Sequence, residues 1–248
     1  MNKYLLTSSM ITFSFFLCKS LKNRQFSIYE IIYSNRKPHF CVLAGYDGGM
    51  ANYDSLVVAL ESGASGSEIA AWLEGMSIQQ RVRVVAAVKG PWVGKLFDRV
   101  RDAEPLVIDD LVPATTPAGA TITYAGRNSL PLFSRFQKRF TRSADGLVFG
   151  YNHQPFRIAG KVTGPGYFVV ADAGEQRPGE LLFDYTQPPP FEPSGWPPYR
   201  PNDVLGARFV FMDMHDYVRR VARGVVVGSA FRRGKDQNTY FSLTSIAG

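Results

Sequence analysis

The sequence predicts an α+β fold, with a bundle of short helices first and a mostly antiparallel, curved sheet or half-barrel after it. Two observations carry this prediction. Apolar residues recur at helical spacing from about residue 52 to residue 103. After residue 120 the pattern changes to short β-branched and aromatic runs bounded by turn residues. We expect one domain from residue 50 onward, with a helical region at 50–112 and a mainly β region at 113–248.

Residues 1–49 form a leader whose composition differs from the rest, with Ala44 as its only alanine. Three interpretations compete: an over-extended start with the true start at Met50, a signal-like segment, or a poorly ordered extension. The apolar run from Tyr4 to Leu17 is diluted by Ser and Thr and precedes no small-residue cleavage site. It is also shorter than the roughly 20 residues of a membrane span. We therefore expect a cytoplasmic protein, with export as the alternative if residues 1–20 act as a signal.

Charge and cysteine content narrow the function classes. The net charge is +7, but the leader holds six basic side chains against two acidic ones, which leaves the other residues near balance. A basic footprint for nucleic acid should lie on the folded domain, so nucleic-acid binding is not expected. Both cysteines, Cys18 and Cys41, belong to the leader. The body therefore uses neither a disulfide framework nor a thiolate nucleophile.

Four short helices are expected between residues 52 and 103. Ser67 is suited to cap the second helix. Ser77 and Gln80 have the spacing of a capping box, which begins the third. Pro91 fits the first turn of the fourth, because its fixed φ is compatible with a helix start. The apolar stripes on these helices are interpreted as core.

The β region is predicted to contain seven short strands and two interruptions. The interruptions are a helix at 129–140, with its phenylalanines inward, and a helix at 214–223, for which a bent strand is the alternative. The seven strands are placed at 121–124, 147–151, 167–170, 181–185, 208–211, 225–227 and 240–243.

A proline-rich arm at 188–201 contains seven prolines and is not a strand, because proline cannot donate to a ladder. It is either an ordered arm packed on the domain surface or a disordered linker. Phe191, Trp196 and Tyr199 favour the packed arm, since a linker would leave these aromatic rings in water.

Catalytic chemistry has few candidates. The weak candidates are His215 with Asp213 or Asp216, together with His153. Adjacent residues do not face each other on a helix or a strand, so Asp216 is poorly placed to orient His215, whereas Asp213 could do so only in a helix. The histidine and cysteine spacing does not match a zinc site. No metal and no cofactor are predicted.

The sequence leaves three function hypotheses open, and oligomeric state is not predicted. The preferred one is a non-catalytic module that binds a small amphipathic or anionic ligand in an apolar pocket with a few arginines. The alternatives are a cofactor-independent enzyme using His215 with a nearby Asp, and a protein- or membrane-surface interaction domain without a membrane span. The candidate ligand-binding residues are Arg127, Arg135, Tyr167, Trp196, Arg200 and Arg219.

Several strings resemble those of an uncharacterised bacterial protein family. They cover most of the body and none of the leader, and the resemblance implies no activity and no catalytic residue. The strings are Gly-Arg-Asn-Ser-Leu-Pro at 126–131, Phe-Gln-Lys-Arg-Phe at 136–140, Thr-Gly-Pro-Gly-Tyr-Phe at 163–168, Gly-Trp-Pro-Pro-Tyr-Arg-Pro-Asn-Asp at 195–203 and Gly-Lys-Asp-Gln-Asn-Thr-Tyr-Phe at 234–241.

Overall fold

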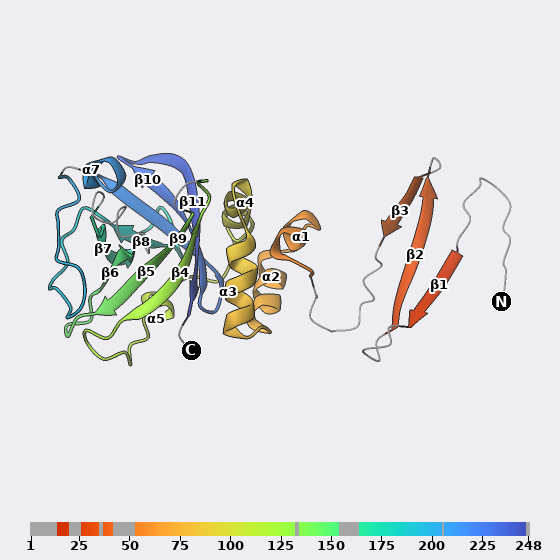
Figure 1. Cartoon of the computed structure of the whole chain (residues 1–248), viewed down its shortest axis with the longest axis horizontal. Helices are drawn as coiled ribbons and strands as arrows, with labels where there is room; N and C mark the ends of the chain where they lie inside the picture. The colour runs from red at the N-terminus through yellow and green to blue at the C-terminus, as the bar shows by residue number, and fades with distance from the viewer. Residues whose placement is uncertain are drawn as a thin grey trace. The chain divides into compact units, whose positions relative to one another are not determined.

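The computed structural model describes residues 14–19, 26–34, 37–41, 53–131, 134–153, 164–204 and 206–246. The chain divides into two compact units, Met1–Gly49 and Met50–Gly248. In the first unit, β1 (Ser14–Lys19), β2 (Phe26–Ser34) and β3 (Lys37–Cys41) form an antiparallel three-stranded sheet with β2 in the middle (Figure 1). Nothing in this sheet distinguishes between the three interpretations of the leader.

The second unit is built on a closed antiparallel barrel of eight strands (Figure 1). The α+β class is confirmed, but the predicted half-barrel is wrong, because β9 pairs with β10 and closes the sheet on itself. Closure removes the exposed strand edges that an open sheet would present. The strands are β4 (Ile122–Asn128), β5 (Arg135–Arg142), β6 (Val148–His153), β7 (Tyr167–Asp172), β8 (Leu181–Asp184), β9 (Met214–Ala222), β10 (Val225–Arg232) and β11 (Lys235–Ser245).

Three segments differ in type from the prediction. Residues 135–140 of the helix predicted at 129–140 belong to strand β5. The segment at 214–223 is strand β9, which agrees with the alternative of a bent strand and not with the preferred helix. The predicted strand at 208–211 is the short helix α7 (Ala207–Val210). In β9 Val218 faces inward and Val221, three positions further along the strand, faces outward toward the helices. The register with β10 shifts beside Val221, which leaves Ala222 on the outer face as well. Apolar residues therefore lie on both faces of β9, and this pattern imitates the spacing of a helix.

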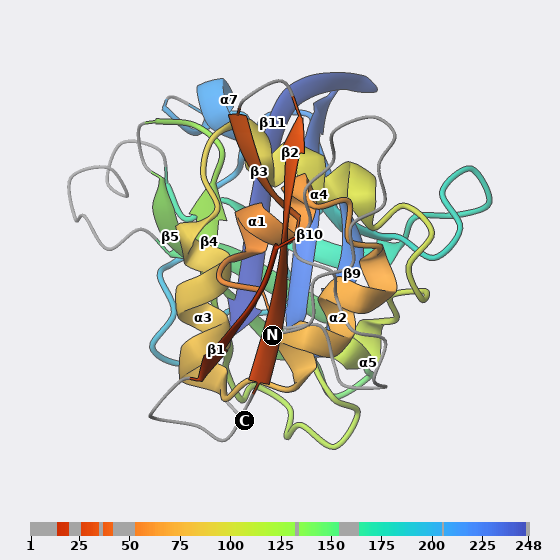
Figure 2. The ribbon, with the colours of Figure 1, turned by 90° about the vertical axis from the view of Figure 1, so that its right-hand side faces the viewer.

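Four helices cover the outer wall of the barrel over β9, β10 and β11 (Figures 1 and 2). They are α1 (Leu56–Glu61), α2 (Gly66–Glu74), α3 (Ile78–Ala87) and α4 (Pro91–Arg99). Ser65 caps α2 in place of the predicted Ser67, because the Glu68 carboxylate accepts from the Ser65 backbone at 2.8 Å and completes a capping box. The capping box of Ser77 and Gln80 on α3 is confirmed.

The interior of the barrel is solid at one end. Tyr124, Phe140, Phe168 and Phe183 are at most 2% exposed, and their ring centroids lie 5.0–5.5 Å apart. We call these four residues the aromatic block. Helix α5 (Ile108–Leu111) lies beyond it, and the Tyr124 hydroxyl donates to the carbonyl oxygen of Leu111 at 3.1 Å. The block and α5 together close this end of the barrel.

The proline-rich arm lies on the outer face of β6 and β7. The Trp196 ring centroid is 4.7 Å from that of Tyr151, and the Tyr167 hydroxyl donates to the carbonyl oxygen of Pro197 at 2.6 Å. The Trp196 indole also donates to the Thr121 hydroxyl at 2.9 Å. These contacts hold the arm by its aromatic side chains. Among the described residues, no helix combines the length and apolar character needed to cross a membrane.

A candidate ligand pocket inside the barrel

A pocket of about 390 Å³ is lined by residues of α7 and by residues of the barrel strands. Helix α7 lies at the opposite end of the barrel from α5 (Figure 1). Its walls are mainly apolar, because the inward positions of the strands carry Phe136, Met214, Ala230 and Phe241. Leu130, Phe209 and Val210 also line it, and each of these three side chains is partly exposed. This volume is near the lower limit of the 300–1,000 Å³ or so typical of small-molecule sites.

Four of the polar side chains that line the pocket lie together: Lys138, Asn152, Tyr185 and Asp216. The other polar residues of the lining are Asn128, Arg232, Gln237 and Thr239. The Lys138 ammonium donates to Asn152 Oδ1 at 2.9 Å, to Asp216 Oδ2 at 3.2 Å and to the Tyr185 hydroxyl. An ammonium has three donors, so this set satisfies it fully. The side chains of Lys138 and Asp216 are only 2% and 5% exposed. We call these four residues the Lys138 cluster.

The strand register brings the cluster together. Lys138 on β5 lies directly opposite Asn152 on β6. Asp216 on β9 lies opposite Phe183 on β8, and Tyr185 follows Phe183 by two residues along the chain. Side chains alternate between the two faces of a strand, so each of these positions faces the barrel interior. The Tyr185 hydroxyl donates to Asp216 Oδ2 at 3.0 Å, which links the last two members.

Burial sets the protonation properties of the cluster. It lowers the pKa of Lys138, since the ammonium has lost its water shell, and the Asp216 carboxylate partly opposes this effect. Burial, with the Asp216 charge as the second cause, raises the pKa of Tyr185 well above its ordinary value. Tyr185 therefore keeps its proton at neutral pH. Five aromatic rings have their centroids within 5.9 Å of Lys138 Nζ and give the cation some compensation.

None of the six ligand-binding residues predicted from the sequence is among the described residues that line this pocket. Arg135 and Arg200 are exposed. The Arg219 guanidinium on β9 binds Glu180 at 2.9 Å and the carbonyl oxygen of Phe97 at 2.8 Å, which ties the barrel wall to α4. Arg127 on β4 is buried but lines no part of the pocket.

The two aromatic candidates contact each other where the proline-rich arm packs on the barrel: the ring centroids of Tyr167 on β7 and Trp196 in the arm lie 6.1 Å apart. They lie on the outer face of the barrel wall, in the cluster formed by Phe149, Tyr151 and Tyr167. The structure therefore joins these two predicted residues, but in a packing role outside the pocket.

The histidine candidates do not form the pairs considered from the sequence. His215 Nε2 lies 3.4 Å from Asp184 Oδ1 on the neighbouring strand, whereas Asp216 points into the barrel. Asp213 binds Arg233 at 2.8 Å in an exposed ion pair. His153 packs beside Tyr151, and burial together with the charge of Arg139 lowers the pKa of His153.

Sequence reasoning missed Lys138, Asn152 and Tyr185. The helix predicted at 129–140 turns its phenylalanines inward, and that prediction gives Lys138 no inward position. The informative pattern was the alternation Phe136, Lys138, Phe140, which on a strand points one lysine inward between two phenylalanines.

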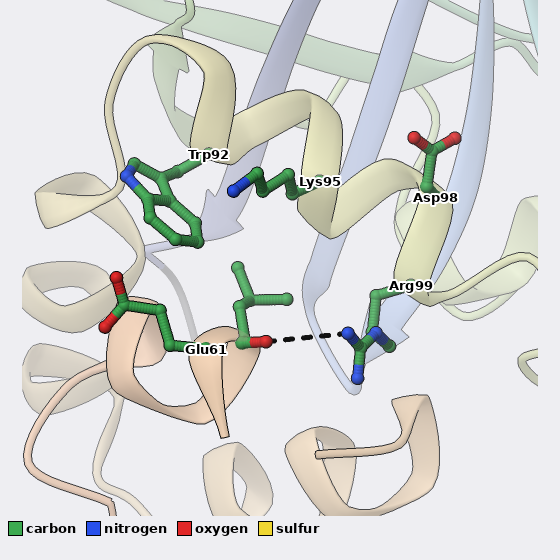
Figure 3. A pocket seen from close by; sticks show the side chains of 6 residues that line it. Glu61, Trp92, Lys95, Asp98 and Arg99 are labelled. Carbon is green, nitrogen blue, oxygen red and sulfur yellow. Dashed lines mark hydrogen bonds between the residues drawn. The ribbon is translucent and has the colours of Figure 1, made fainter. Parts of the chain in front are cut away.

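A second, more open hollow of about 740 Å³ lies between α1 and α4 (Figure 3). Lys95 Nζ lies 3.8 Å from the centroid of the Trp92 ring, and the Arg99 guanidinium donates to the backbone oxygens of Ala64 and Leu60 at 2.5 and 3.5 Å. These charged groups already have partners within the helical layer. We therefore place the candidate site in the barrel, where buried polar groups border an apolar cavity.

Neither metal-binding residues nor relatives identify the site. Among the described residues, no group of three or more His, Cys, Asp or Glu side chains is arranged to hold a metal ion. No protein-family model, curated protein or solved structure matches the chain. The assignment therefore depends on the geometry of the pocket.

Proposed function

We propose that the barrel is a non-catalytic module that binds a small amphipathic molecule in the pocket of about 390 Å³. The apolar part of the ligand packs against Phe136 and Phe241, and its polar group meets the Lys138 cluster. The single observation that carries this proposal is the buried Lys138 cluster on an apolar pocket. Binding sites typically combine apolar walls with a few convergent polar groups in this way.

Charge balance narrows the ligand. Lys138 and Asp216 neutralise each other at 3.2 Å, so an ionised carboxylate placed against the cluster would meet the Asp216 carboxylate with no unpaired cation inside the cluster. A neutral carbonyl or hydroxyl group is better matched there, because it can exchange hydrogen bonds with Lys138, Asn152 or Tyr185. Arg232 also lines the pocket, and its guanidinium donates to the backbone oxygens of Phe209 and Val210 at 2.9 Å, so an acidic group on a ligand would be placed near Arg232 rather than at the cluster. The proposal therefore favours a neutral polar group at the Lys138 cluster.

The test is fluorescence titration of the full chain with N-phenyl-1-naphthylamine, a neutral amphipathic dye, and competition by octanol. Ala230 faces the cavity, so Ala230→Phe fills part of it and is expected to weaken dye binding by about tenfold or more, equivalent to about 1.4 kcal/mol. The matched control is Ala171→Phe, the same change at a partly exposed position of β7 whose neighbours Phe168 and Val170 face inward. This control is expected to bind the dye as the wild type does.

Two results would overturn the proposal. One is the absence of saturable dye binding in the folded wild-type protein. The other is equal dye affinity in wild type and Ala230→Phe, with circular dichroism showing that both are folded. Native mass spectrometry of protein purified from its own host then tests for a retained molecule and gives its mass.

A further inference from the structure

We propose that Lys138 Nζ forms an imine with the aldehyde or ketone group of a ligand held in the barrel pocket. This inference rests on the proposed function and names the chemical class of its ligand. It starts from the position of Lys138, which is one of the residues that line the pocket although its side chain is only 2% exposed.

The neighbours of Lys138 supply the groups that imine formation needs. The Asp216 carboxylate, 3.2 Å from Nζ, is positioned to take one ammonium proton and leave a neutral amine. In a low-dielectric interior, a neutral amine beside a neutral carboxylic acid is an accessible alternative to the ion pair. The Tyr185 hydroxyl contacts the same amine and serves as a proton donor. Burial also lowers the pKa of Lys138, which favours the neutral amine.

The reaction balances without any further reactant. The nitrogen lone pair of the neutral amine forms a bond to the carbonyl carbon, and the π electrons of the carbonyl move to its oxygen, which takes a proton from Tyr185. The amine nitrogen of this adduct loses a proton, which restores Tyr185. Protonation of the adduct hydroxyl by Asp216 then releases water and leaves a protonated imine. A lysine ammonium and a carbonyl compound have become an iminium and water, so the charge stays at +1 and Asp216 remains its counterion.

The apolar walls favour the product. Phe136 and Phe241 flank the cluster and restrict access of bulk water, which would hydrolyse the imine. Lys138 lies between the aromatic block, where Nζ is 4.6 Å from the centroid of the Phe168 ring, and the pocket whose lining it joins.

The experiment exposes the full chain to octanal and sodium cyanoborohydride, which reduces imines to stable amines, and maps the modified lysines by peptide mass spectrometry. Lys89, Lys95 and Lys235 are exposed and serve as internal references. Lys138 is expected to be modified about tenfold faster than each of them, because the pocket holds the bound aldehyde beside the amine. Octanol, which binds without a carbonyl group, is expected to protect Lys138 and leave the reference lysines unchanged.

Two variants separate chemistry from folding. Lys138→Arg keeps a cation but cannot form an imine, so labelling at this position is lost. Tyr185→Phe removes the proton donor while keeping the ring, and it is expected to slow labelling of Lys138 without changing labelling of Lys95. If either variant fails to fold, octanol protection in the wild type still decides the matter.

The outcomes distinguish the two proposals. If the wild type binds the naphthylamine dye but octanal labels Lys138 no faster than Lys89, Lys95 and Lys235, the imine is overturned and the ligand pocket stands. Failure of octanol to protect Lys138 in a protein that binds the dye also overturns the imine. If the dye does not bind at all, the proposed function is overturned first.

Discussion

At both ends of the barrel every second strand residue points inward, but these residues fill the space at one end and border a cavity at the other. At the end closed by α5, the aromatic block fills the space with four rings. At the end carrying α7, the inward positions hold the Lys138 cluster beneath a cavity of about 390 Å³. The comparison indicates that the apolar core is concentrated at one end, so that the other end can keep a cavity and buried polar groups.

The largest expected effect comes from removing a ring of the aromatic block. Phe140 is fully buried among Tyr124, Phe168 and Phe183, so Phe140→Ala is expected to lower the free energy of unfolding by about 4 kcal/mol. The matched change at the other end is Phe209→Ala. Phe209 is 72% exposed, and its removal is expected to cost less than about 0.5 kcal/mol.

Urea denaturation measures the free energy of unfolding of Phe140→Ala and of Phe209→Ala, and the naphthylamine titration measures their affinity for the dye. Phe209 lines the pocket, so Phe209→Ala should weaken dye binding although it leaves stability almost unchanged. Similar losses of stability from the two substitutions would show that the interior is not divided into a filled end and an open end.

A smaller loss is expected from breaking the buried pair. Asp216→Asn leaves Lys138 buried without its counterion, which is expected to cost about 3 kcal/mol of unfolding free energy. Replacing both partners, with Lys138→Met and Asp216→Leu, should recover stability to within about 1 kcal/mol of the wild type, because no buried charge then remains. Urea denaturation of the single and double variants measures this recovery. A double variant as unstable as the single one would contradict it.

The Asp216→Asn variant also has a predicted pH dependence. Burial already lowers the pKa of Lys138 below its ordinary 10.5, and loss of the carboxylate removes the group that opposes this. Between the lowered pKa and 10.5 the unfolded chain holds a proton that the folded protein has released. The free energy of unfolding of this variant should therefore rise with pH through that window. A flat profile in urea denaturation between pH 7 and 10 would contradict it.

Much of the fold could be predicted from the sequence, because local patterns determine it. The capping box at Ser77 and Gln80, the β-branched runs of β7 and β10 and the apolar run of β8 are visible without the structure. The closure of the barrel could not be predicted, since it depends on the pairing of β4 with β11, the first and last strands of the barrel in the chain. No local pattern encodes such long-range register.

The site was harder to predict than the fold. Asp216 was considered only as a partner of His215, and strand alternation sends these two neighbours to opposite faces. Lys138 and Asp216 are separated by 78 positions and meet only through barrel closure. The arginines offered an obvious charge pattern, but Arg219 is used to hold α4 against the wall. A buried lysine is visible in a sequence only after its segment has been recognised as a strand.

The smallest expected difference in unfolding free energy is between alanine substitutions at two interior glycines, Gly150 and Gly126. A Cβ on Gly150 would lie 2.5 Å from the carbonyl oxygen of Arg139 and 2.7 Å from the ring of Phe168, a member of the aromatic block. A Cβ on Gly126 would lie 2.6 Å from the ring of Phe136, which borders the pocket. The first clash involves backbone and a fixed ring, whereas the second can be relieved by a ring that has free space beside it.

Gly150→Ala is therefore expected to cost about 2 kcal/mol of unfolding free energy, and Gly126→Ala about 1 kcal/mol or less. The displaced Phe136 ring should reduce the cavity, so Gly126→Ala weakens binding of the naphthylamine dye while Gly150→Ala leaves the affinity of the folded fraction unchanged. Urea denaturation and dye titration on the same preparations measure both effects. If Gly126→Ala proved as destabilising as Gly150→Ala and left dye affinity unchanged, Phe136 would be as tightly held as the aromatic block. The cavity beside it could then not be adaptable space for a ligand.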